Sequence, residues 1–432
     1  YTRPDMPLPA RLDTLTQDTA SIGDLSWWEL YNDTTLQQLI HRALTYNKDL
    51  KIASARMNEL AALKRIDFAN MFPQATARLN GNRETTNYGG DNFDADPELS
   101  LTATISWELD LWGNLRWARD HSTAEFLASV ENCRAVKMGL VAQVAQSYFE
   151  LMALDNELAI VRRTLEARRE GVRLAEIRFK GGLTSEIVFQ QAKVELAKTT
   201  TMVPDLERRI SLKESEIALL TGDFPYAVNR NVLPEEIQLP DALPLGLPST
   251  LLERRPDIRK AERELMAAHA EVGLAYTNMF PRLALTATLG AESETLRDLL
   301  KSPYSYLAGN LLSPLFAMGK NRAALKAKRA AYEGAVAEYE KTVLAAFKET
   351  HNAIINFNKI KDIYESRRQL AEASRTAVEL AQLQYINGVI GYLDLLDAQR
   401  NYFDAQVSLS NAVCDKQLMI INLYKALGGG WK

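Results

Sequence analysis

The sequence has no apolar run long enough to form a membrane-spanning helix. Of its 432 residues 47% are hydrophobic, yet no stretch approaches the roughly 18 apolar residues that such a helix needs. If the chain spans a membrane, it must therefore do so with β-strands. This absence excludes a helical membrane protein and leaves either a water-soluble protein or one that crosses the membrane with strands.

The sequence also lacks an excess of basic charge and has few cysteines and histidines. The 51 basic residues are outweighed by 55 acidic ones, for a formal net charge of -4, whereas a nucleic-acid-binding protein usually has a basic surface. Cys133 and Cys414 have no metal-ligand spacing and form no disulfide framework. The histidines lack metal-ligand spacing too, and we expect them in surface or packing positions: His41, His121, His269 and His351. The sequence therefore predicts no metal site, no cofactor and no nucleic-acid partner.

Enzyme signatures and a targeting segment are missing as well. The stretches "KGG" and "LGGG" lack the strand-loop-helix frame of a phosphate-binding loop, and no nucleophile stands in a recognisable arrangement with a base. We therefore predict that the protein is not an enzyme. The chain opens with "YTRPDMPLPA", which has neither a basic start nor an apolar segment, as expected of a mature or trimmed form.

An internal duplication is the most informative feature that is present. Three pairs of segments match each other: 70–73 with 278–281 (both "NMFP"), 111–116 with 317–322, and 178–192 with 384–399. In the last pair Gly182 corresponds to Gly388. Each repeat therefore reads as a helix, a pair of strands, a long helix, a glycine turn and a shorter helix.

The duplication predicts the domain organisation. The chain is expected to begin with an extended segment (1–32), followed by the first repeat (33–222). A proline-rich linker that disfavours helix (223–256) then leads to the second repeat (257–427) and a tail (428–432). The first repeat is expected to contain strands at about 74–88 and 98–112, a long helix at about 115–180 and a short helix at about 186–220. The second is expected to contain strands at about 282–292 and 304–316, a long helix at about 320–386 and a short helix at about 393–427.

Both long helices are expected to pack through a coiled-coil seam. Residues recur at alternating spacings of three and four, which is the pattern of such a seam. In the second repeat they are Val336, Tyr339, Val343, Ala346, Thr350, Ala353, Phe357, Ile360 and Tyr364. The first repeat has the same spacing from Val130 to Leu158, so Cys133 is expected to pack in the seam. Charged residues off the seam, such as Arg168, are expected to face water.

The four predicted strands alternate apolar and polar residues. A half-buried soluble sheet has the same alternation. Membrane strands are favoured by segment lengths of about 9–11 residues, polar loops within the hairpins and aromatic residues near the strand ends. Four strands cannot close a barrel in lipid, so two or three chains would have to share one, and only three would leave a useful lumen.

The segment 243–290 resembles a known family. Its Leu-Pro, Leu-Leu-Glu-Arg-Arg-Pro-Asp, Ala-Glu and Phe-Pro elements are the signature of the outer membrane efflux proteins, the TolC-like exit ducts of tripartite pumps. The N-terminal "YTRPDMPLPA" and "WWELYNDTTLQQLIHRAL" look like the branch that serves resistance-nodulation-division transporters. The resemblance extends over essentially the whole chain.

The resemblance implies a homotrimer of mixed α and β fold. Its twelve-stranded transmembrane β-barrel, with four strands per chain, would lie in the lipid of a Gram-negative outer membrane and continue into a long periplasmic α-helical barrel. A periplasmic adaptor protein and an inner-membrane resistance-nodulation-division transporter would be its partners. Many members are lipoproteins whose acylated cysteine just precedes a segment like "YTRP", so any such anchor would lie upstream of Tyr1.

The implied function is a passive exit channel for drugs or other small molecules, and hence a part in antibiotic resistance. A duct for metal ions or secreted protein stays open as an alternative. So does a different class, a structural coiled-coil rod without a channel.

A gate is expected near the second glycine turn. Asp394 and Asp397 are three residues apart on one helix face, and in a three-fold assembly they would form a ring of carboxylates that favours cations. Acids at a helix start are also favoured by the helix dipole alone. The resemblance places constricting aspartates in this motif and matches Tyr385 to a constriction position. Where some relatives have an arginine, this chain has Ile390.

The two glycine turns are the expected contacts of the adaptor. Gly182 and Gly388 fit the positive φ of a tight turn, and a purely structural role is compatible with this. Given the resemblance, the exposed candidates for contact are Leu183, Thr184, Ser185, Val389 and Ile390.

Overall fold

The computed structural model describes residues 1–4, 26–27, 33–86, 94–231, 248–314 and 318–431. The chain divides into two compact units. The sheet unit comprises Tyr1–Met6, Ser54–Glu131 and Arg259–Thr342, and the helical unit comprises Pro7–Ala53, Asn132–Ile258 and Val343–Lys432. Most of the segment 1–32 lies outside the described residues, so its extended conformation stays a prediction.

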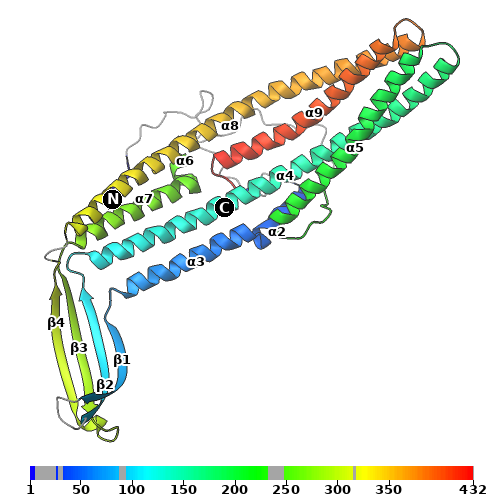
Figure 1. Ribbon diagram of the computed structural model, residues 1–432. Helices are drawn as coiled ribbons and strands as arrows, with labels where there is room; N and C mark the ends of the chain where they lie inside the picture. Colours follow the sequence, from blue (N-terminus) through cyan, green and yellow to red (C-terminus); the bar gives the residue numbers. More distant parts are fainter. Residues whose placement is uncertain (5–25, 28–32, 87–93, 232–247, 315–317, 432) are drawn as a thin grey trace. The chain divides into compact units, whose positions relative to one another are not determined.

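Four antiparallel strands form the sheet of the sheet unit, in the order β1-β2-β3-β4 (Figure 1). They are β1 (Gln74–Thr86), β2 (Asp94–Leu109), β3 (Arg282–Ser293) and β4 (Pro303–Leu312). The two central strands, β2 and β3, come from different repeats. Within the described residues β1 and β4 each pair with one strand only, so the outer edge of each presents unpaired backbone groups.

The strand register sorts the side chains into an apolar and a polar face. Paired residues point to the same side of a sheet, and Leu101 pairs with Leu79 on one strand and Ala291 on the other. The larger members of the apolar face are Leu79, Leu99, Leu101, Ile105, Trp107, Leu283, Leu285, Leu289, Leu307 and Leu311. The opposite face is mainly serine, threonine and asparagine. The alternation expected from the sequence therefore continues across all four strands.

Three strand bounds differ from the expected ones. β2 begins at Asp94 rather than at about 98. β2 stops before Asp110 rather than at 112, because the Asp110 side chain turns to the next helix and accepts a hydrogen bond from the Leu115 N–H at 3.0 Å. β4 stops before Pro314 rather than at 316, and a proline has no N–H to donate to a strand ladder.

Two helices precede each strand pair. In the first repeat they are α2 (Thr34–Tyr46) and α3 (Lys48–Ala69), and in the second they are α6 (Pro248–Arg254) and α7 (Pro256–Thr277). α6 forms inside the linker 223–256, where the prolines were expected to disfavour helix. The reason is position, since proline is well tolerated in the first turn of a helix and begins both α6 and α7.

Two helix hairpins continue the chain, each a long helix followed by a shorter one (Figure 1). They are α4 (Asn114–Lys180) with α5 (Glu186–Leu220), and α8 (Lys320–Ile386) with α9 (Tyr392–Ala426). The expected seam is buried on α8 at Tyr339, Val343, Ala346, Thr350, Ala353, Phe357 and Ile360. Cys133 is half-buried. In the described part of the chain no helix is both long and apolar enough to cross a membrane.

Candidate functional site

The two glycine turns have the same backbone geometry. Gly182 has φ 71° and Gly388 has φ 74°, and a Cβ at either position would meet nothing within 4 Å. Each glycine is thus required by its positive φ rather than by crowding. The Leu183 N–H donates a hydrogen bond to the Arg178 carbonyl at 2.9 Å. A bond of this kind is typical of a helix that ends in a residue with left-handed conformation. Both turns lie at the same end of the helical unit (Figure 1).

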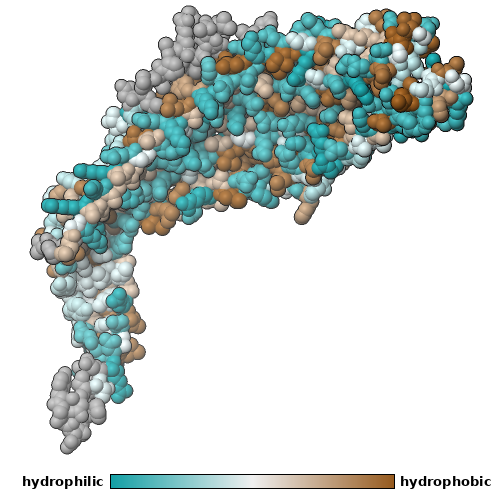
Figure 2. Space-filling view, turned by 45° about the horizontal axis from the view of Figure 1, so that its top comes forward, coloured by the Kyte–Doolittle hydropathy of each residue, from teal (hydrophilic) through white to brown (hydrophobic). Residues whose placement is uncertain are grey.

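Exposed apolar side chains surround the turns. Leu183 is 73% exposed and Val389 70% exposed, and Ile187 and Leu393 follow in the first turns of α5 and α9. Figure 2 shows apolar residues gathered at this end of the helical unit. Of the other expected contact residues, Ser185 is exposed, whereas Thr184 and Ile390 are half-buried. Exposed apolar residues grouped in this way are typical of a protein-contact surface.

Asp394 and Asp397 are both exposed in the first turns of α9. The Asp394 carboxylate accepts the Gly391 N–H at 3.0 Å, and the Asp397 carboxylate accepts from the Asn401 amide at 3.3 Å. Neither forms an ion pair with a described basic side chain. Asp394 thus has the role of a helix-start acid, and both carboxylates keep oxygens free for a further role.

The two aspartates begin a longer polar stripe on α9. Its members follow the three-four spacing of one helix face and are exposed or half-buried: Asp394, Asp397, Asn401, Asp404, Ser408, Asn411 and Asp415. When the repeats are aligned on their turn glycines, the matching positions of α5 are Val188, Gln191, Glu195, Lys198, Met202, Asp205 and Arg209. The two acids of the α5 positions are balanced by two basic residues, whereas the α9 stripe has four acids and no basic residue.

Tyr385, at the end of α8, is buried at 7% exposure. Its ring lies 5.8 Å from that of Tyr392, and the Arg178 guanidinium lies 4.9 Å from its centroid. Burial first, and Tyr385 second, raise the pKa of Tyr392. Within a single chain Tyr385 therefore packs between the ends of α4, α8 and α9.

Glu195, which the sequence did not single out, joins three helices. It is 4% exposed on α5 and accepts from Arg400 of α9 at 2.5 Å, from Lys198 at 3.1 Å and from Arg168 of α4. Burial raises the pKa of this carboxyl, but the hydrogen bonds from the two arginines and Lys198 outweigh it and hold the pKa at about 2. Arg168, expected to face water, is in fact buried against Glu195.

A sequence signal for this cluster exists. Ala192, Glu195 and Thr199 follow the three-four spacing of a packing seam, and all three are buried. A carboxylate in such a seam requires cationic partners, because an unpaired buried charge is costly.

Comparison with known proteins decides what this architecture is. The model of the outer membrane efflux protein family matches residues 39–223 and 247–429. The chain belongs to this family. It is 33% identical over 412 residues to the solvent efflux pump outer membrane protein SrpC of Pseudomonas putida, covering 93% of this chain and 87% of that protein. It is 32% identical over 426 residues to the outer membrane protein OprJ of Pseudomonas aeruginosa, covering 95% and 88%.

Solved structures of outer-membrane channels have the same fold. The channel OprN aligns with a TM-score of 0.90 at 30% identity, covering 100% of this chain and 99% of OprN. The open state of the Neisseria gonorrhoeae MtrE channel aligns with a TM-score of 0.89 at 28% identity, covering 100% and 98%. The protein is therefore an outer-membrane channel component of an efflux pump in a Gram-negative bacterium. The efflux prediction is confirmed over the alternative of a structural rod, and the family consists of channel components rather than enzymes.

Proposed function

We propose that three copies of this chain form one exit duct. The observation that carries the proposal is the sheet. In the described residues it has an unpaired edge on both β1 and β4 and an apolar face on which most of the large side chains, Leu79 and Leu307 among them, are exposed. An open strand edge is not viable in lipid. Pairing of β4 with β1 of the next copy removes both edges, and twelve strands leave a lumen.

The two faces of the sheet then have different neighbours. The apolar face meets outer-membrane lipid, as the outward face of such barrels does. The polar face lines the lumen, where the hydroxyls of Thr104 and Thr288 hydrogen-bond across β2 and β3 at 3.0 Å. The Tyr304 ring lies against Gly290 on this face, where a Cβ would come within 2.5 Å of it, and so it covers the bare backbone.

The helix turns are the proposed site of adaptor contact. Leu183 and Val389 are the most exposed apolar residues of the two turns, and Gly182, Thr184, Ser185, Gly388 and Ile390 complete the surface. A periplasmic adaptor bound there connects the duct to an inner-membrane resistance-nodulation-division transporter, which supplies the energy. The cargo is then drugs, solvents or other small molecules. Metal ions are the second candidate, because the chain is also 28% identical to the cation efflux system protein CusC of Escherichia coli.

The proposed gate lies at the start of α9. Around the three-fold axis Asp394 and Asp397 form a double ring of carboxylates, while the buried Tyr385 ring supports the start of α9 from behind. Arg400 ties α9 to Glu195 on α5, so an outward movement of α9 must break or carry this ion pair. In the resting state the carboxylate rings repel anions by their charge, and the narrow opening between them blocks larger molecules.

Single-channel recording tests the gate. In planar bilayers the double variant Asp394→Ala, Asp397→Ala is expected to have a larger resting conductance and a weaker preference for cations, because side chains and charge are removed from the narrowest part. Asp404→Ala, which lies on the same polar stripe but further from the start of α9, is the matched control and is expected to change conductance less. Equal conductance of wild type and double variant would refute the gate.

A further inference from the structure

A cavity in the sheet unit has no part in the proposed gate. It lies where α7 ends and β3 begins, beside the end of β4 and the first turns of α8, and has a volume of about 650 Å3. Pockets for drug-sized ligands have roughly 300–1,000 Å3. All of its lining residues belong to the sheet unit, so the cavity is complete within that unit.

The walls of this cavity have an excess of positive charge. Arg282, Lys320 and Lys328 line it together with one carboxylate, that of Glu271. Lys328 is neutralised by Glu271 at 2.8 Å. Arg282 donates only to the neutral Asn278 amide oxygen at 2.7 Å, and neither Arg282 nor Lys320 forms an ion pair with a carboxylate of the described residues. Two cations are therefore left without a countercharge.

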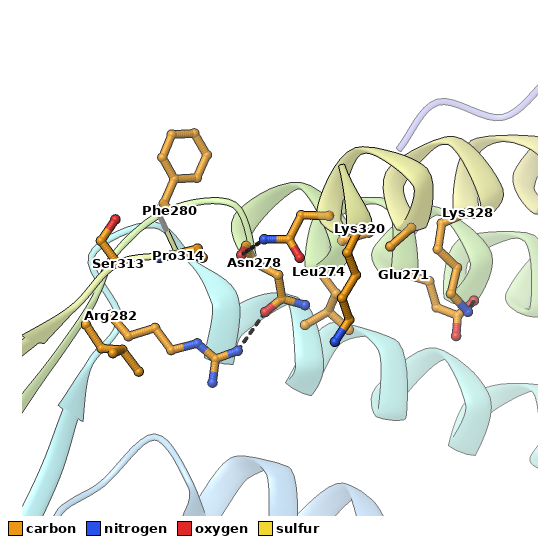
Figure 3. A pocket seen from close by; sticks show the side chains of 13 residues that line it. Glu271, Leu274, Asn278, Phe280, Arg282, Ser313, Pro314, Lys320 and Lys328 are labelled. Carbon is orange, nitrogen blue, oxygen red and sulfur yellow. Dashed lines mark hydrogen bonds and ion pairs between the residues drawn. The ribbon is translucent and has the colours of Figure 1, made fainter. Parts of the chain in front are cut away.

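The two uncompensated cations line the same cavity. Figure 3 shows the Arg282 and Lys320 side chains extending from β3 and α8 on either side of Asn278 and Leu274. Lys320 is the first residue of α8, and the free N–H groups of a helix start favour an anion as well. A positive side chain is unfavourable at such a helix start unless an anion is near.

The rest of the lining is mainly apolar. It consists of Leu274, Ala275, Phe280, Leu312, Pro314 and Ala324, together with the neutral polar residues Asn278, Ser313 and Asn321. Phe280 is held by stacking on Trp112 at 5.0 Å, and the Trp112 indole N–H donates to the Pro281 carbonyl at 2.8 Å. Apolar walls next to two cations favour a ligand that has both an anionic group and an apolar body, and they disfavour cations and fully hydrated inorganic ions.

The face of the sheet identifies the source of this ligand. Arg282 pairs with Leu312 and alternates with the apolar Leu283, so it lies on the polar face of β3. The headgroups of outer-membrane lipids would meet the other face. A ligand at Arg282 therefore comes from the lumen.

We propose that this cavity is a binding site for amphipathic organic anions, with the anionic group between Arg282 and Lys320 and the apolar body on Leu274 and its apolar neighbours in the lining. The assignment of the ligand as cargo rests on the proposed function, whereas its binding does not. Such a site retains anionic molecules that the aspartates of α9 alone would repel.

Equilibrium dialysis on the assembled protein in nanodiscs of zwitterionic lipid tests the site. The probe is a naphthalenesulfonate, and the matched neutral probe is the naphthalenemethanol of the same apolar body. We expect saturable binding of the sulfonate, about tenfold weaker binding of the alcohol, and weaker sulfonate binding as salt is raised. The double variant Arg282→Gln, Lys320→Gln should bind the sulfonate at least about tenfold more weakly and the alcohol unchanged.

Arg322→Gln with Lys326→Gln is the matched control, since both residues are exposed on the same helix outside the cavity. It should leave sulfonate binding within about twofold of wild type. If the double variant fails to assemble, Lys320→Gln alone serves, because it removes no described ion pair, and it should weaken binding severalfold. Absence of sulfonate binding to wild type, equal binding by the cavity variant, or equal loss in the control overturns the proposal. A conducting channel that does not bind the sulfonate refutes this site and leaves the proposed function intact.

Discussion

The sheet and the helical unit treat apolar side chains in opposite ways. In the helical unit Tyr148, Leu151 and Ile421 are fully buried by their own chain, with exposures of 0%. In the sheet Leu79 is 65% and Leu307 81% exposed, although the register gathers them on one face. The helical unit therefore has its own core, whereas the apolar face of the sheet is left exposed by its own chain and, in the proposed duct, meets lipid. Leu183 and Val389 at the helix turns are exposed in the same way.

The largest expected effect is from a charge on the apolar face. Leu289→Arg in the central strand β3 should cost about 2–4 kcal/mol per chain at mid-membrane depth, and the proposed trimer would have three such charges in one barrel. We expect loss of the protein from the outer-membrane fraction and of oligomers on mild gels. Thr286→Arg, on the polar face of the same strand, is the control and should still assemble. Equal failure of both variants would contradict the assignment of the faces.

A core truncation in the helical unit should act differently. Leu151→Ala is expected to lower the free energy of unfolding by about 2–5 kcal/mol, because it leaves a cavity in a closed core. Leu79→Ala, the same change on the sheet, removes contacts with lipid rather than with protein and should leave unfolding of the helices unchanged. Thermal unfolding followed by circular dichroism compares the two. A helical transition that shifts equally in both variants would show that the two regions are not independent.

The Glu195 cluster predicts a pH dependence of the resting channel. The pKa of this carboxyl is about 2, below its ordinary 4.5, so its stabilisation is complete above pH 4.5 and is lost as the pH falls toward 2. We expect resting conductance to rise in this window because Arg400 is released from α5.

The variant Glu195→Gln sharpens this test. It should have raised conductance already at pH 7 and a flatter response between pH 4.5 and 2. Glu207→Gln, at an exposed ion pair with Arg162 on the same helix, is the control and should behave as wild type. A wild-type channel that does not respond to pH in this window would exclude Glu195 as a determinant of closure.

The smallest effect on the protein itself is expected at the turns. Leu183→Glu with Val389→Glu changes exposed side chains, so stability should stay within about 0.5 kcal/mol of wild type. Conductance should be unchanged as well, while efflux in cells and cross-linking to the adaptor should fall. Leu212→Glu, an exposed α5 residue away from the turn, is the control. Full efflux by the turn variant would show that the adaptor does not use this surface.

Features that follow a repeating local pattern could be predicted from the sequence. The alternation in 99–111 and 283–289 predicted the apolar face, and the pairing of Gly182 with Gly388 predicted both turns, because local patterns determine each. Features that depend on contacts between distant segments were not predicted. The three-four spacing of Ala192, Glu195 and Thr199 marks Glu195 as a seam position, but its pairing with Arg168 and Arg400 follows only from the packing of three helices.

Backbone details were missed for a related reason. The role of a residue at an element boundary depends on which neighbour it meets. Asp110 ends β2 because its carboxylate binds the start of α4, and α6 forms in a proline-rich segment because its proline falls in the first turn. Composition alone does not fix either position.

Disulfide trapping across the strand edges tests most directly whether copies complete the sheet. In a Cys133→Ser, Cys414→Ala background, Ala77→Cys on β1 is combined in turn with Ser305→Cys, Leu307→Cys or Gly309→Cys on β4. Within one chain β2 and β3 separate these positions by about 14 Å, well beyond the roughly 7 Å that a disulfide allows. The account predicts that oxidation of the membrane-embedded protein gives covalent species that stop at three copies. Monomers only, under conditions in which the cysteines are shown to be oxidisable, would contradict it.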